Sequence, residues 1–523
     1  MKFQLLAASV AALSSVVSAE EALEPRALPL VQSVRASIFP SYMRYLQAEL
    51  TSLQNQLRRV LLRSELLAKA RTLEGFAYAT PQRNRQIFTP GHKATYEWLY
   101  ESIKKLSDYY TVEYHEFLTQ SASATVAVDG ANIVAEPLTF TPNGKPTGTV
   151  VVVPNLGCDA ADYAGLDLTG KVALISRGTC NFSVKTLFAG SAGAVGTIIY
   201  NNADSALGGT LGGENPEFIP TVMISRVDGL ALVSSSQTAT KTAALDVLVT
   251  ELPTYNVIAQ TKGGDQNNVL LAGAHSDSVK AGPGINDNGS GTIALLEIAQ
   301  QLTKFSTKNA IRFAWWSAEE VGLVGSTKYV ESLSPEELAK ITLYLNFDML
   351  ASPNYVYAIY DGDGSAFNIS GPPGSAAAEK LFEDYFTNDA GLNHVPTAFN
   401  SRSDYAAFAA AGVPVGGLFT GAEVLKTPLE QQLFGGQAGV AYDVNYHAAG
   451  DNVSNCNVGA WIQNSKAIAH AVATYGVSFE SLGIGKREER VQKRSMWKQE
   501  VPREEDHSSH HVGGGCSHSV ELA

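Results

Sequence analysis

The sequence predicts a three-layer α/β/α fold with a mostly parallel central sheet, into which a second, β-rich module is inserted. From residue 255 to 479, short apolar segments alternate with segments whose apolar residues recur at helical spacing, a pattern typical of parallel α/β sheets. From about residue 121 to 249 the helical periodicity fades, and short β-branched segments alternate with glycine and asparagine turns, which indicates the inserted module. A chain of 523 residues, 45% of them hydrophobic, is long enough to form both cores.

The first residues have the features of a secretory signal peptide. Lys2 precedes a short apolar segment, and Val17-Ser18-Ala19 provides a small-residue cleavage site after residue 19. We therefore expect a secreted, extracellular protein, in preference to a vacuolar one. The apolar segment is too short to span a membrane and no other segment is long and apolar enough, so we expect no membrane partner.

Residues 20–65 are predicted to form a leader that precedes the core. Apolar residues recur there at helical spacing: Leu46, Leu50, Leu53, Leu57 and Val60. Such a helix could be a pro-segment that is removed from a zymogen, or equally an extra surface helix. At the other end, residues 481–523 contain two dibasic pairs and a segment rich in Glu, Ser, Gly and His, so we expect a disordered tail.

The main body is expected over residues 66–120 and 253–480, with the module over residues 121–252 between them. The first part is predicted to contain two helices and a strand, near residues 66–76, 94–106 and 110–117. One helix is predicted in the module, at residues 183–193. The second part is predicted to contain strands at residues 269–274, 311–316, 342–347 and 413–419, with helices starting near residues 292, 326, 376 and 405.

The cysteines and glycosylation sequons fit an oxidising, extracellular compartment. Cys158 and Cys180 bracket a compact segment and could form a disulfide, whereas the pairing of Cys456 and Cys516 is left open. A sequon at Asn288 lies in a glycine-rich turn and is expected to be too enclosed for a glycan. Glycans are expected at three other sequons: Asn181, Asn368 and Asn452.

Several predicted strands are followed by residues that can bind a metal ion. These residues are His275 and Asp287 after the first strand and its turn, Glu319 and Glu320 after the second, Asp348 after the third, and His447 in the loop after the last. In an open α/β sheet, the carboxyl ends of the strands meet at one crevice, where ligands bind. One such residue alone is more often structural. Several carboxylates at one edge repel each other unless cations neutralise them.

Imidazole and carboxylate ligands suit zinc, and a pair of ions about 3.5–4 Å apart shares one carboxylate. Two divalent ions and a bound hydroxide would balance three carboxylate ligands. Asp287, in its tight turn, is best placed to bridge the two ions. Asp277 is expected to orient the ring of His275, and Glu319 is expected to take a proton from water.

The sequence lacks the motifs or the charge that are typical of three other classes of protein. No Gly-x-Ser-x-Gly elbow follows a predicted strand, which disfavours a serine hydrolase. No His-Glu-x-x-His motif occurs, which disfavours a thermolysin-type zinc site. The formal net charge of −13 argues against a nucleic-acid partner, because no basic surface dominates.

The motifs, taken together and in order, resemble those of co-catalytic di-zinc aminopeptidases. They are His275-Ser276-Asp277, the glycine-rich segment 284–291, the segment 317–323 around Glu319 and Glu320, Asn346-Phe347-Asp348-Met349, and Tyr446-His447. The likeness is greatest to the fungal secreted leucine aminopeptidases and to the vacuolar aminopeptidase Y type. The inserted module, with the segments 176–180 and 193–196, is similar to a protease-associated domain, which implies that it shapes access to the site or simply stabilises the fold.

The resemblance implies a ligand set for two zinc ions. One ion would take His275 and Asp348, the other would take Glu320 and His447, and Asp287 would join them.

It also implies roles for neighbouring residues. Glu319 matches the general base, Tyr446 matches the residue that stabilises the oxyanion, and Arg402 matches a residue that contacts substrate. Many relatives flank the Tyr-His pair with two bridged cysteines, but this chain has Asn445 and Gly450 there. Because both cysteines are absent together, we interpret the difference as the loss of one disulfide rather than as damage to the site.

The implied function is hydrolysis of peptides that have a free N-terminus, with release of a hydrophobic, leucine-like residue by a monomeric enzyme containing two zinc ions. Two alternatives stay open. One is a carboxypeptidase on the same scaffold. The other is a non-catalytic, receptor-type binding protein, although such proteins lose ligands and this chain has all five.

Overall fold

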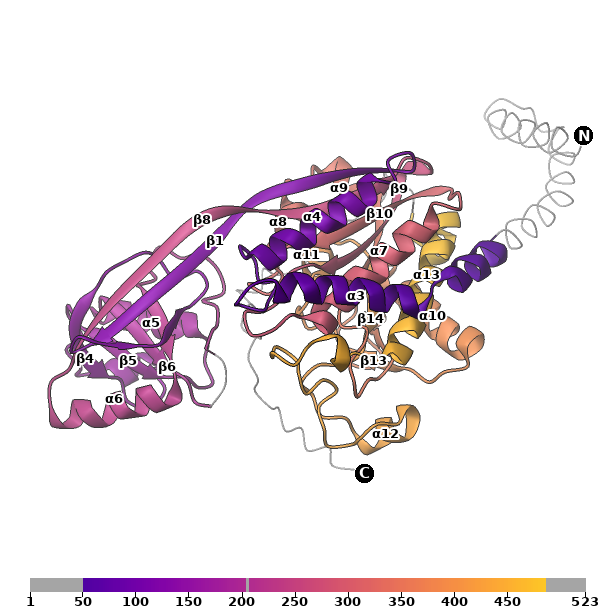
Figure 1. Cartoon of the computed structure of the whole chain (residues 1–523). Coiled ribbons are helices and arrows are strands. Elements are labelled where there is room, and N and C mark those ends of the chain that lie inside the picture. The colour runs from indigo at the N-terminus through magenta and orange to yellow at the C-terminus, as the bar shows by residue number, and fades with distance from the viewer. Residues whose placement is uncertain (1–49, 204–206, 486–523) are drawn as a thin grey trace, which may run out of the picture. The chain divides into compact units, whose positions relative to one another are not determined.

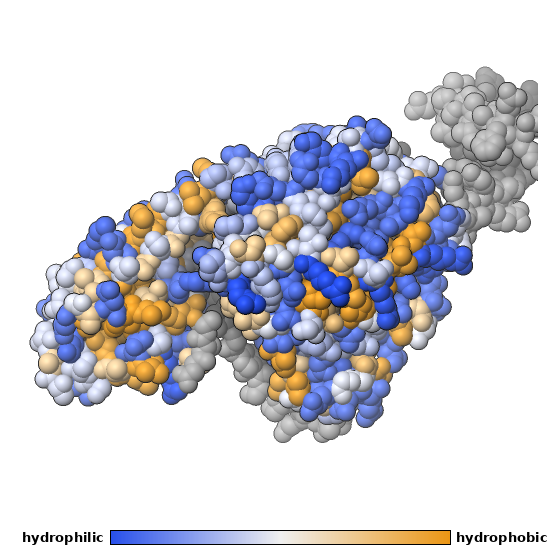
Figure 2. Space-filling view, in the orientation of Figure 1, coloured by the Kyte–Doolittle hydropathy of each residue, from blue (hydrophilic) through white to orange (hydrophobic). Residues whose placement is uncertain are grey.

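The computed structural model of the chain describes residues 50–203 and 207–485 (Figure 1). Of the described residues, those from Leu57 onward belong to one compact unit, and residues 50–56 belong to another. The predicted signal peptide and nearly all of the predicted tail lie outside the described residues. Within the described ranges, no helix combines the length and the apolar character needed to cross a membrane. On the face seen in Figure 2, hydrophilic residues surround separate, smaller hydrophobic areas.

Four parallel strands form the centre of the main sheet, as the alternating pattern predicted. In spatial order they are β14 (Val415–Phe419), β11 (Ile341–Phe347), β9 (Asp265–His275) and β10 (Asn309–Trp316). Most of their residues are buried, and this burial on both faces explains why the sequence shows continuous apolar segments rather than alternation. The sheet continues through two short strands on one side and through an antiparallel strand on the other: β12 (Ala358–Tyr360), β13 (Val395–Thr397) and β8 (Thr242–Thr261).

Helices cover both faces of this sheet and complete the predicted three layers. One layer consists of α3 (Arg63–Tyr78), α4 (Pro90–Lys104), α7 (Gly291–Leu302), α10 (Ser375–Asp384) and α13 (Val458–Val477). The other consists of α8 (Val324–Ser332), α9 (Pro335–Lys340) and α11 (Tyr405–Ala410), whose buried side chains share a core cluster with the strands. Trp316 and Tyr344 belong to that cluster, and the indole Nε1–H of Trp316 donates to the Tyr344 hydroxyl at 2.8 Å.

The main body also contains shorter helical elements. They are η2 (Ile285–Ser290), η3 (Tyr385–Ala390), α12 (Pro428–Phe434), η4 (Val453–Asn455) and η5 (Glu480–Leu482).

The inserted module has its own cores, and its strands continue the main sheet by pairing with β8. Its strands are β2 (Ala131–Ile133), β3 (Ala135–Pro137), β4 (Thr147–Val152), β5 (Val172–Ser176), β6 (Gly196–Tyr200) and β7 (Thr221–Ile224), of which β4 to β7 are parallel. It contains the short turn η1 (Ala160–Tyr163) and two α-helices, α5 (Phe182–Ser191) and α6 (Arg226–Thr238). Helix α5 corresponds to the helix predicted at residues 183–193, whereas α6 was not predicted. Helix α6 buries only Gly229 and Leu232, so its sequence has almost no apolar periodicity.

Two long strands connect the module to the main body. Strand β1 (Tyr110–Val128) pairs antiparallel with β8 over its whole length, and both are visible as the long arrows in Figure 1. The predicted module boundaries fall inside these strands and almost opposite each other, since Ser121 pairs with Thr250. The change from helical periodicity to short β-branched segments therefore falls within a continuous two-stranded ribbon rather than at a linker.

The end of the predicted leader packs within the same unit as the main body. Leu57 and Leu61 are buried, and Arg58 forms an ion pair with Asp389, with 2.8 Å between Nη1 and Oδ2. Whether residues 20–65 are removed as a pro-segment stays a prediction.

The structure describes three of the four cysteines and all four sequons, while glycosylation itself stays a prediction. Cys158 and Cys180 form a disulfide with Cα atoms 5.7 Å apart. Cys456 has no disulfide partner among the described residues, and Cys516 lies outside them, so the pairing of these two cysteines stays open. Asn288 is buried, and its side-chain amide donates to the Phe347 carbonyl at 2.9 Å, which leaves no room for a glycan. The three predicted glycan acceptors are exposed or partly exposed: Asn181, Asn368 and Asn452.

Candidate metal centre

The predicted ligands lie at one edge of the sheet because parallel strands deliver them there. His275 is the last residue of β9, and Asp348 directly follows β11. Glu319 and Glu320 lie in the turn after β10, and Asp287 lies in η2, just before α7. His447 comes from the long loop after β14.

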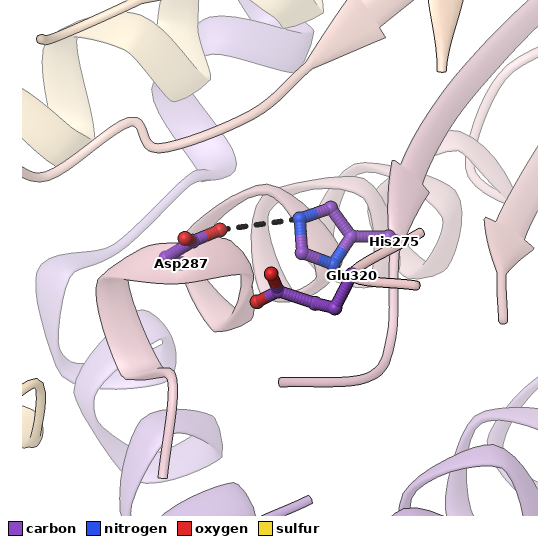
Figure 3. Close-up of side chains that lie close together, drawn as sticks. All are labelled: His275, Asp287 and Glu320. Atoms are coloured by element: carbon purple, nitrogen blue, oxygen red, sulfur yellow. Dashed lines mark ion pairs between the residues drawn. The ribbon is translucent and has the colours of Figure 1, made fainter. Parts of the chain in front are cut away.

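Asp287 lies between the two histidines. Its Oδ1 is 3.2 Å from Nε2 of His275, and its Oδ2 is 3.2 Å from Nε2 of His447. A carboxylate with each oxygen next to a different imidazole nitrogen has the arrangement required of a ligand shared by two cations. Figure 3 shows His275, Asp287 and Glu320 pointing toward one another from separate segments.

Each of the two histidines also has a second carboxylate next to it. Glu320 Oε2 lies 3.1 Å from Nε2 of His447, and Asp348 Oδ1 lies 3.4 Å from Nε2 of His275. Glu320 Oε1 and Asp348 Oδ1 are both buried without a hydrogen-bond partner. Unsatisfied buried carboxylate oxygens are costly, so the donor set fits a pair of divalent cations.

The charges of these groups depend strongly on one another. Burial lowers the pKa of His447, but Glu320 and Asp287 outweigh burial and raise this pKa to about 10. Burial raises the pKa of Asp287, yet its hydrogen bonds to His275 and His447 bring it below the usual range. The same carboxylates that hold protons on the imidazoles would hold cations in place of those protons.

Glu319 lies inside the site without being needed as a ligand. Its Oε2 is 3.7 Å from Nε2 of His275, and its side chain is buried. Burial raises the pKa of Glu319 well above its usual range, and the nearby Glu320 and Asp348 carboxylates raise it further against the opposing effect of His275. A carboxylate with a raised pKa is a stronger base than an exposed one.

Asp277 is placed near His275 but is more closely engaged elsewhere. Its Oδ1 is 3.8 Å from Nδ1 of His275, which is too long for a hydrogen bond. Its two oxygens accept from the backbone N–H groups of Glu319 and Glu320, each at 3.3 Å. Asp277 therefore holds the turn that presents both glutamates, which was not predicted, and its role in orienting the His275 ring stays a prediction.

Residues far away in the sequence support the Asp287 turn and were not predicted. Asp451 accepts from the backbone N–H groups of Asn286 and Asp287, at 2.8 and 2.9 Å. The buried Arg85 donates to the carbonyl oxygens of Ser276, Pro283 and Gly284. Their partners are mainly backbone groups of a distant loop, so no motif in the sequence could have identified them.

Tyr446 and Arg402, both predicted from the resemblance, lie side by side. Arg402 Nη2 donates to the Tyr446 hydroxyl at 3.2 Å, and Arg402 Nη1 lies 2.7 Å from Glu423 Oε1. Glu423 was not predicted. It fixes the guanidinium, which in turn fixes the phenol hydroxyl.

Three of the site's turns contain a residue with left-handed backbone geometry. Ala318, Met349 and His447 have φ values of 63°, 53° and 54°. Such conformations cost energy in residues other than glycine and persist where the surroundings enforce them, often at functional sites.

A cavity opens beside the ligands. Its lining includes three acidic residues, Asp287, Glu319 and Asp348, together with apolar and aromatic residues. The lining residues are Asp287, Glu319, Asp348, Met349, Tyr360, Thr397, Ala398, Asn400, Arg402, Ser403, Phe419, Ala422, Tyr446 and His447.

The fold and the site together define a metallopeptidase-type α/β domain with an inserted module, and comparison with known proteins agrees. Residues 256–472 match the profile of Peptidase family M28, and residues 146–232 match that of the PA domain. The chain is 51% identical to the probable leucine aminopeptidase 2 of Aspergillus fumigatus, over 86% of this chain and 90% of that protein. It is 45% identical to the leucine aminopeptidase 2 of Arthroderma otae, over 99% of both. The chain belongs to peptidase family M28.

Solved structures are similar over most of the chain. An aminopeptidase from Aneurinibacillus sp. strain AM-1 has a TM-score of 0.61 and 27% identity, covering 80% of this chain and 95% of that one. BSAP, a zinc aminopeptidase from Bacillus subtilis, has a TM-score of 0.66 and 25% identity, covering 81% and 97%. These likenesses confirm the predicted fold and the predicted resemblance.

Proposed function

We propose that this protein is a secreted, zinc-dependent aminopeptidase that releases hydrophobic, leucine-like residues from the N-terminus of peptides. The observation that carries this proposal is the position of Asp287, whose two carboxylate oxygens face the two histidines while Glu320 and Asp348 flank them. The names of the relatives and structural neighbours support the same activity.

Two zinc ions per chain would account for all five predicted ligands. His275 and Asp348 would hold one ion, Glu320 and His447 would hold the other, and Asp287 would contact both. Zinc at such a site polarises a carbonyl oxygen and eases the deprotonation of water. Imidazole and carboxylate groups are common zinc ligands, and the described cluster contains both.

Glu319 would handle the proton during hydrolysis. In this proposal its carboxylate takes a proton from the attacking water and later returns it to the departing amine. Its burial next to His275 leaves it inside the site but outside the proposed ligand set. It is therefore free to gain and lose a proton without loss of a ligand.

Tyr446 and Arg402 would stabilise the charge that develops on the scissile carbonyl oxygen. The Tyr446 hydroxyl accepts from Arg402 at 3.2 Å, which leaves the hydroxyl's own proton available for donation to the substrate. A hydrogen bond aimed at the developing oxyanion lowers the barrier to attack. Glu423 would hold Arg402 in place through its ion pair.

The cavity suggests how the substrate's first residue would be recognised. A protonated α-amino group would be attracted to the Glu319 and Asp348 carboxylates in its lining. A branched apolar side chain could contact Met349, Phe419 and Ala422, which also line it. We expect the inserted PA domain to affect which longer peptides reach this cavity, and we expect a monomer.

The test compares hydrolysis of leucine p-nitroanilide with that of its N-acetylated form, before and after removal of metal by a chelator. We expect cleavage of the free amine only, loss of activity on chelation, and recovery on addition of zinc. Cleavage of the acetylated substrate would contradict an aminopeptidase. Metal binding without turnover of either substrate would favour a non-catalytic binding protein, and release of C-terminal residues from peptides would favour a carboxypeptidase.

A further inference from the structure

A second group of carboxylates lies where strand β12 ends. Asp361 directly follows β12, Asp363 comes two residues later, and Glu379 reaches the same place from α10. One carboxylate oxygen from each of the three lies within 4.8 Å of the others. None of them belongs to the ligand set proposed above.

Asp361 leaves one buried oxygen without a partner. Its side chain is 0% exposed. Its Oδ2 accepts from the backbone N–H groups of Ala366 and Phe367, at 3.0 and 2.9 Å, while its Oδ1 has no hydrogen-bond partner. The loop therefore curls around the carboxylate and uses one oxygen, and the other oxygen remains available.

The other two carboxylates are also oriented by backbone donors. Glu379 Oε2 accepts from the N–H groups of Gly362 and Asp363, at 2.8 and 3.1 Å. Asp363 Oδ1 accepts from the N–H of Ser365 at 2.8 Å. These bonds fix the positions of the carboxylates but do not neutralise the negative charge of the cluster.

The described part of the chain places no cationic side chain in an ion pair with this cluster. Among the residues that the structure describes, no Lys, Arg or His forms an ion pair with Asp361, Asp363 or Glu379. Lys380, next to Glu379 in sequence, pairs with Asp384 at 3.0 Å instead. Burial raises the pKa of Glu379 to about 7, and the Asp363 charge adds to this effect. A cation from solution could therefore bind at this cluster and balance its charge.

We propose that Asp361, Asp363 and Glu379 bind a calcium ion. The donors are all oxygens, with no imidazole or thiol among them, and this favours a hard cation over zinc. Asp361, Asp363 and Ser365 follow at alternate positions, with the first carboxylate held by N–H groups five and six residues later. Alternate oxygen side chains in a short curled loop, completed by a glutamate from a helix, are the ligand pattern of protein calcium loops.

The cluster adjoins the wall of the catalytic cavity. Tyr360, which precedes Asp361, and Thr397 both line that cavity. The N–H of Asp361 donates to the Thr397 carbonyl at 2.9 Å. A bound cation would tie the β12–β13 edge to α10, so it would stabilise this wall without contacting the reacting groups.

The test measures binding of radioactive calcium to the zinc-loaded enzyme by equilibrium dialysis. We expect one saturable site with a dissociation constant on the order of 10⁻⁴ M, in the range of extracellular calcium modules. Asp361→Asn and Asp363→Asn should each weaken binding by about tenfold or more, because each removes one ligand charge. Glu383→Gln, on the same helix but outside the cluster, should bind like the wild type.

A second measurement uses the melting temperature of the same zinc-loaded proteins. Calcium at about 10 mM should raise the melting temperature of the wild type and of Glu383→Gln by several degrees, and it should raise that of Asp361→Asn and Asp363→Asn much less. Asp363 is exposed, so its variant should fold even if Asp361→Asn does not. Absence of saturable calcium binding up to about 10 mM would overturn the proposal. So would binding that Asp363→Asn leaves unchanged. Neither result depends on peptidase activity.

Discussion

Two acidic residues of the site, Glu319 and Asp287, have different surroundings and therefore different expected roles. Asp287 has both oxygens close to histidine nitrogens at 3.2 Å. Glu319 has one distant histidine contact, at 3.7 Å, and no place in the proposed ligand set. Substitution of each carboxylate by its amide keeps the shape and removes the charge, so the two roles can be separated.

Glu319→Gln should lower kcat by about 10²–10⁴-fold, because an amide cannot accept the proton from water. The variant should retain the wild-type zinc content and melting temperature. Asp287→Asn is the matched comparison: it should lose zinc during dialysis, since a shared ligand would have lost its charge. Steady-state kinetics and metal analysis after dialysis check both. Near wild-type turnover in Glu319→Gln would remove Glu319 from the mechanism.

Glu423→Gln should lower kcat by about fivefold while KM changes little. The ion pair that holds Arg402 would be lost, and a partly exposed charge-assisted pair is worth about 1 kcal/mol. If Glu423 acts through Arg402 and the Tyr446 hydroxyl, the substitution should have little further effect in a Tyr446→Phe background. A double-mutant cycle measures this coupling. Equal effects in both backgrounds would show that Glu423 acts elsewhere.

At the residue scale, the sequence allowed prediction of the ligand-type residues but not of the residues that hold them. His275 and Asp348 end or follow apolar strands, so their meeting at one edge follows from the parallel sheet. Asp451 and Arg85 were not predictable, because they bind backbone groups of a loop that is remote in sequence. Asp277 was predicted as a partner of His275, yet its hydrogen bonds go to the glutamate turn.

At the scale of elements, burial decided which helices could be predicted. Helix α7 is buried along almost its whole length and has a strong apolar pattern, so it was predicted. Helix α6 buries two residues and was missed. The strands β1 and β8 extend beyond the predicted segments because much of their ribbon is exposed, and an exposed ribbon needs no apolar alternation.

Helix α13 should make the protein sensitive to acid through His470. Burial lowers the pKa of His470 to about 4, Arg58 adds to this effect and Asp389 opposes it. The Tyr385 ring packs against the imidazole, with centroids 5.1 Å apart. Between about pH 6.5 and 4 the unfolded chain binds a proton that the folded state does not, so stability falls as the pH falls.

This loss should amount to as much as about 3 kcal/mol. His470→Gln should remove it, because the variant has no titrating group there. Urea unfolding of both proteins at about pH 7, 5 and 4 gives the comparison, and the difference between them cancels the effect of metal loss. Parallel stability curves for the two proteins would contradict this assignment.

The turn that contains Tyr446 should accept the disulfide that many relatives have. A Cβ atom added at Gly450 would lie 2.0 Å from Asn445 Oδ1, so the two positions face each other. The double variant Asn445→Cys/Gly450→Cys should oxidise and gain about 2 kcal/mol of stability for a loop of about five residues. The serine double variant is the control for size. Thiol titration and non-reducing peptide mapping check the bond, and pairing with Cys456 instead would contradict the expected geometry.

At the scale of the whole molecule, the peptidase body and the PA domain have separate cores. The cluster around Trp316 and Tyr344 contains residues of the body, and three other clusters contain residues of the module and of the ribbon that joins it. Lys280, in the loop between β9 and η2, forms an ion pair with Glu136 of the module. The side chain of Lys280 is 65% exposed, and an exposed pair of this kind contributes little to stability.

The body should therefore fold without the module. Ser121 and Thr250 are paired across the ribbon, so residues 122–249 can be replaced by Asn-Gly, which favours the tight turn of a two-residue hairpin. This variant should keep its zinc and hydrolyse leucine p-nitroanilide within about threefold of the wild-type rate, because no residue of the site is removed and changes far from the chemistry leave transition-state contacts intact. Its KM for longer peptides should change, since the module is expected to affect their access.

The control is Glu136→Gln, which keeps the module and weakens only its contact with Lys280. An effect that this variant does not share with the shortened protein comes from loss of the module rather than from loss of that contact. If the shortened protein fails to fold or loses activity toward the small substrate, the module is part of the catalytic unit, and the independence of the two cores is wrong.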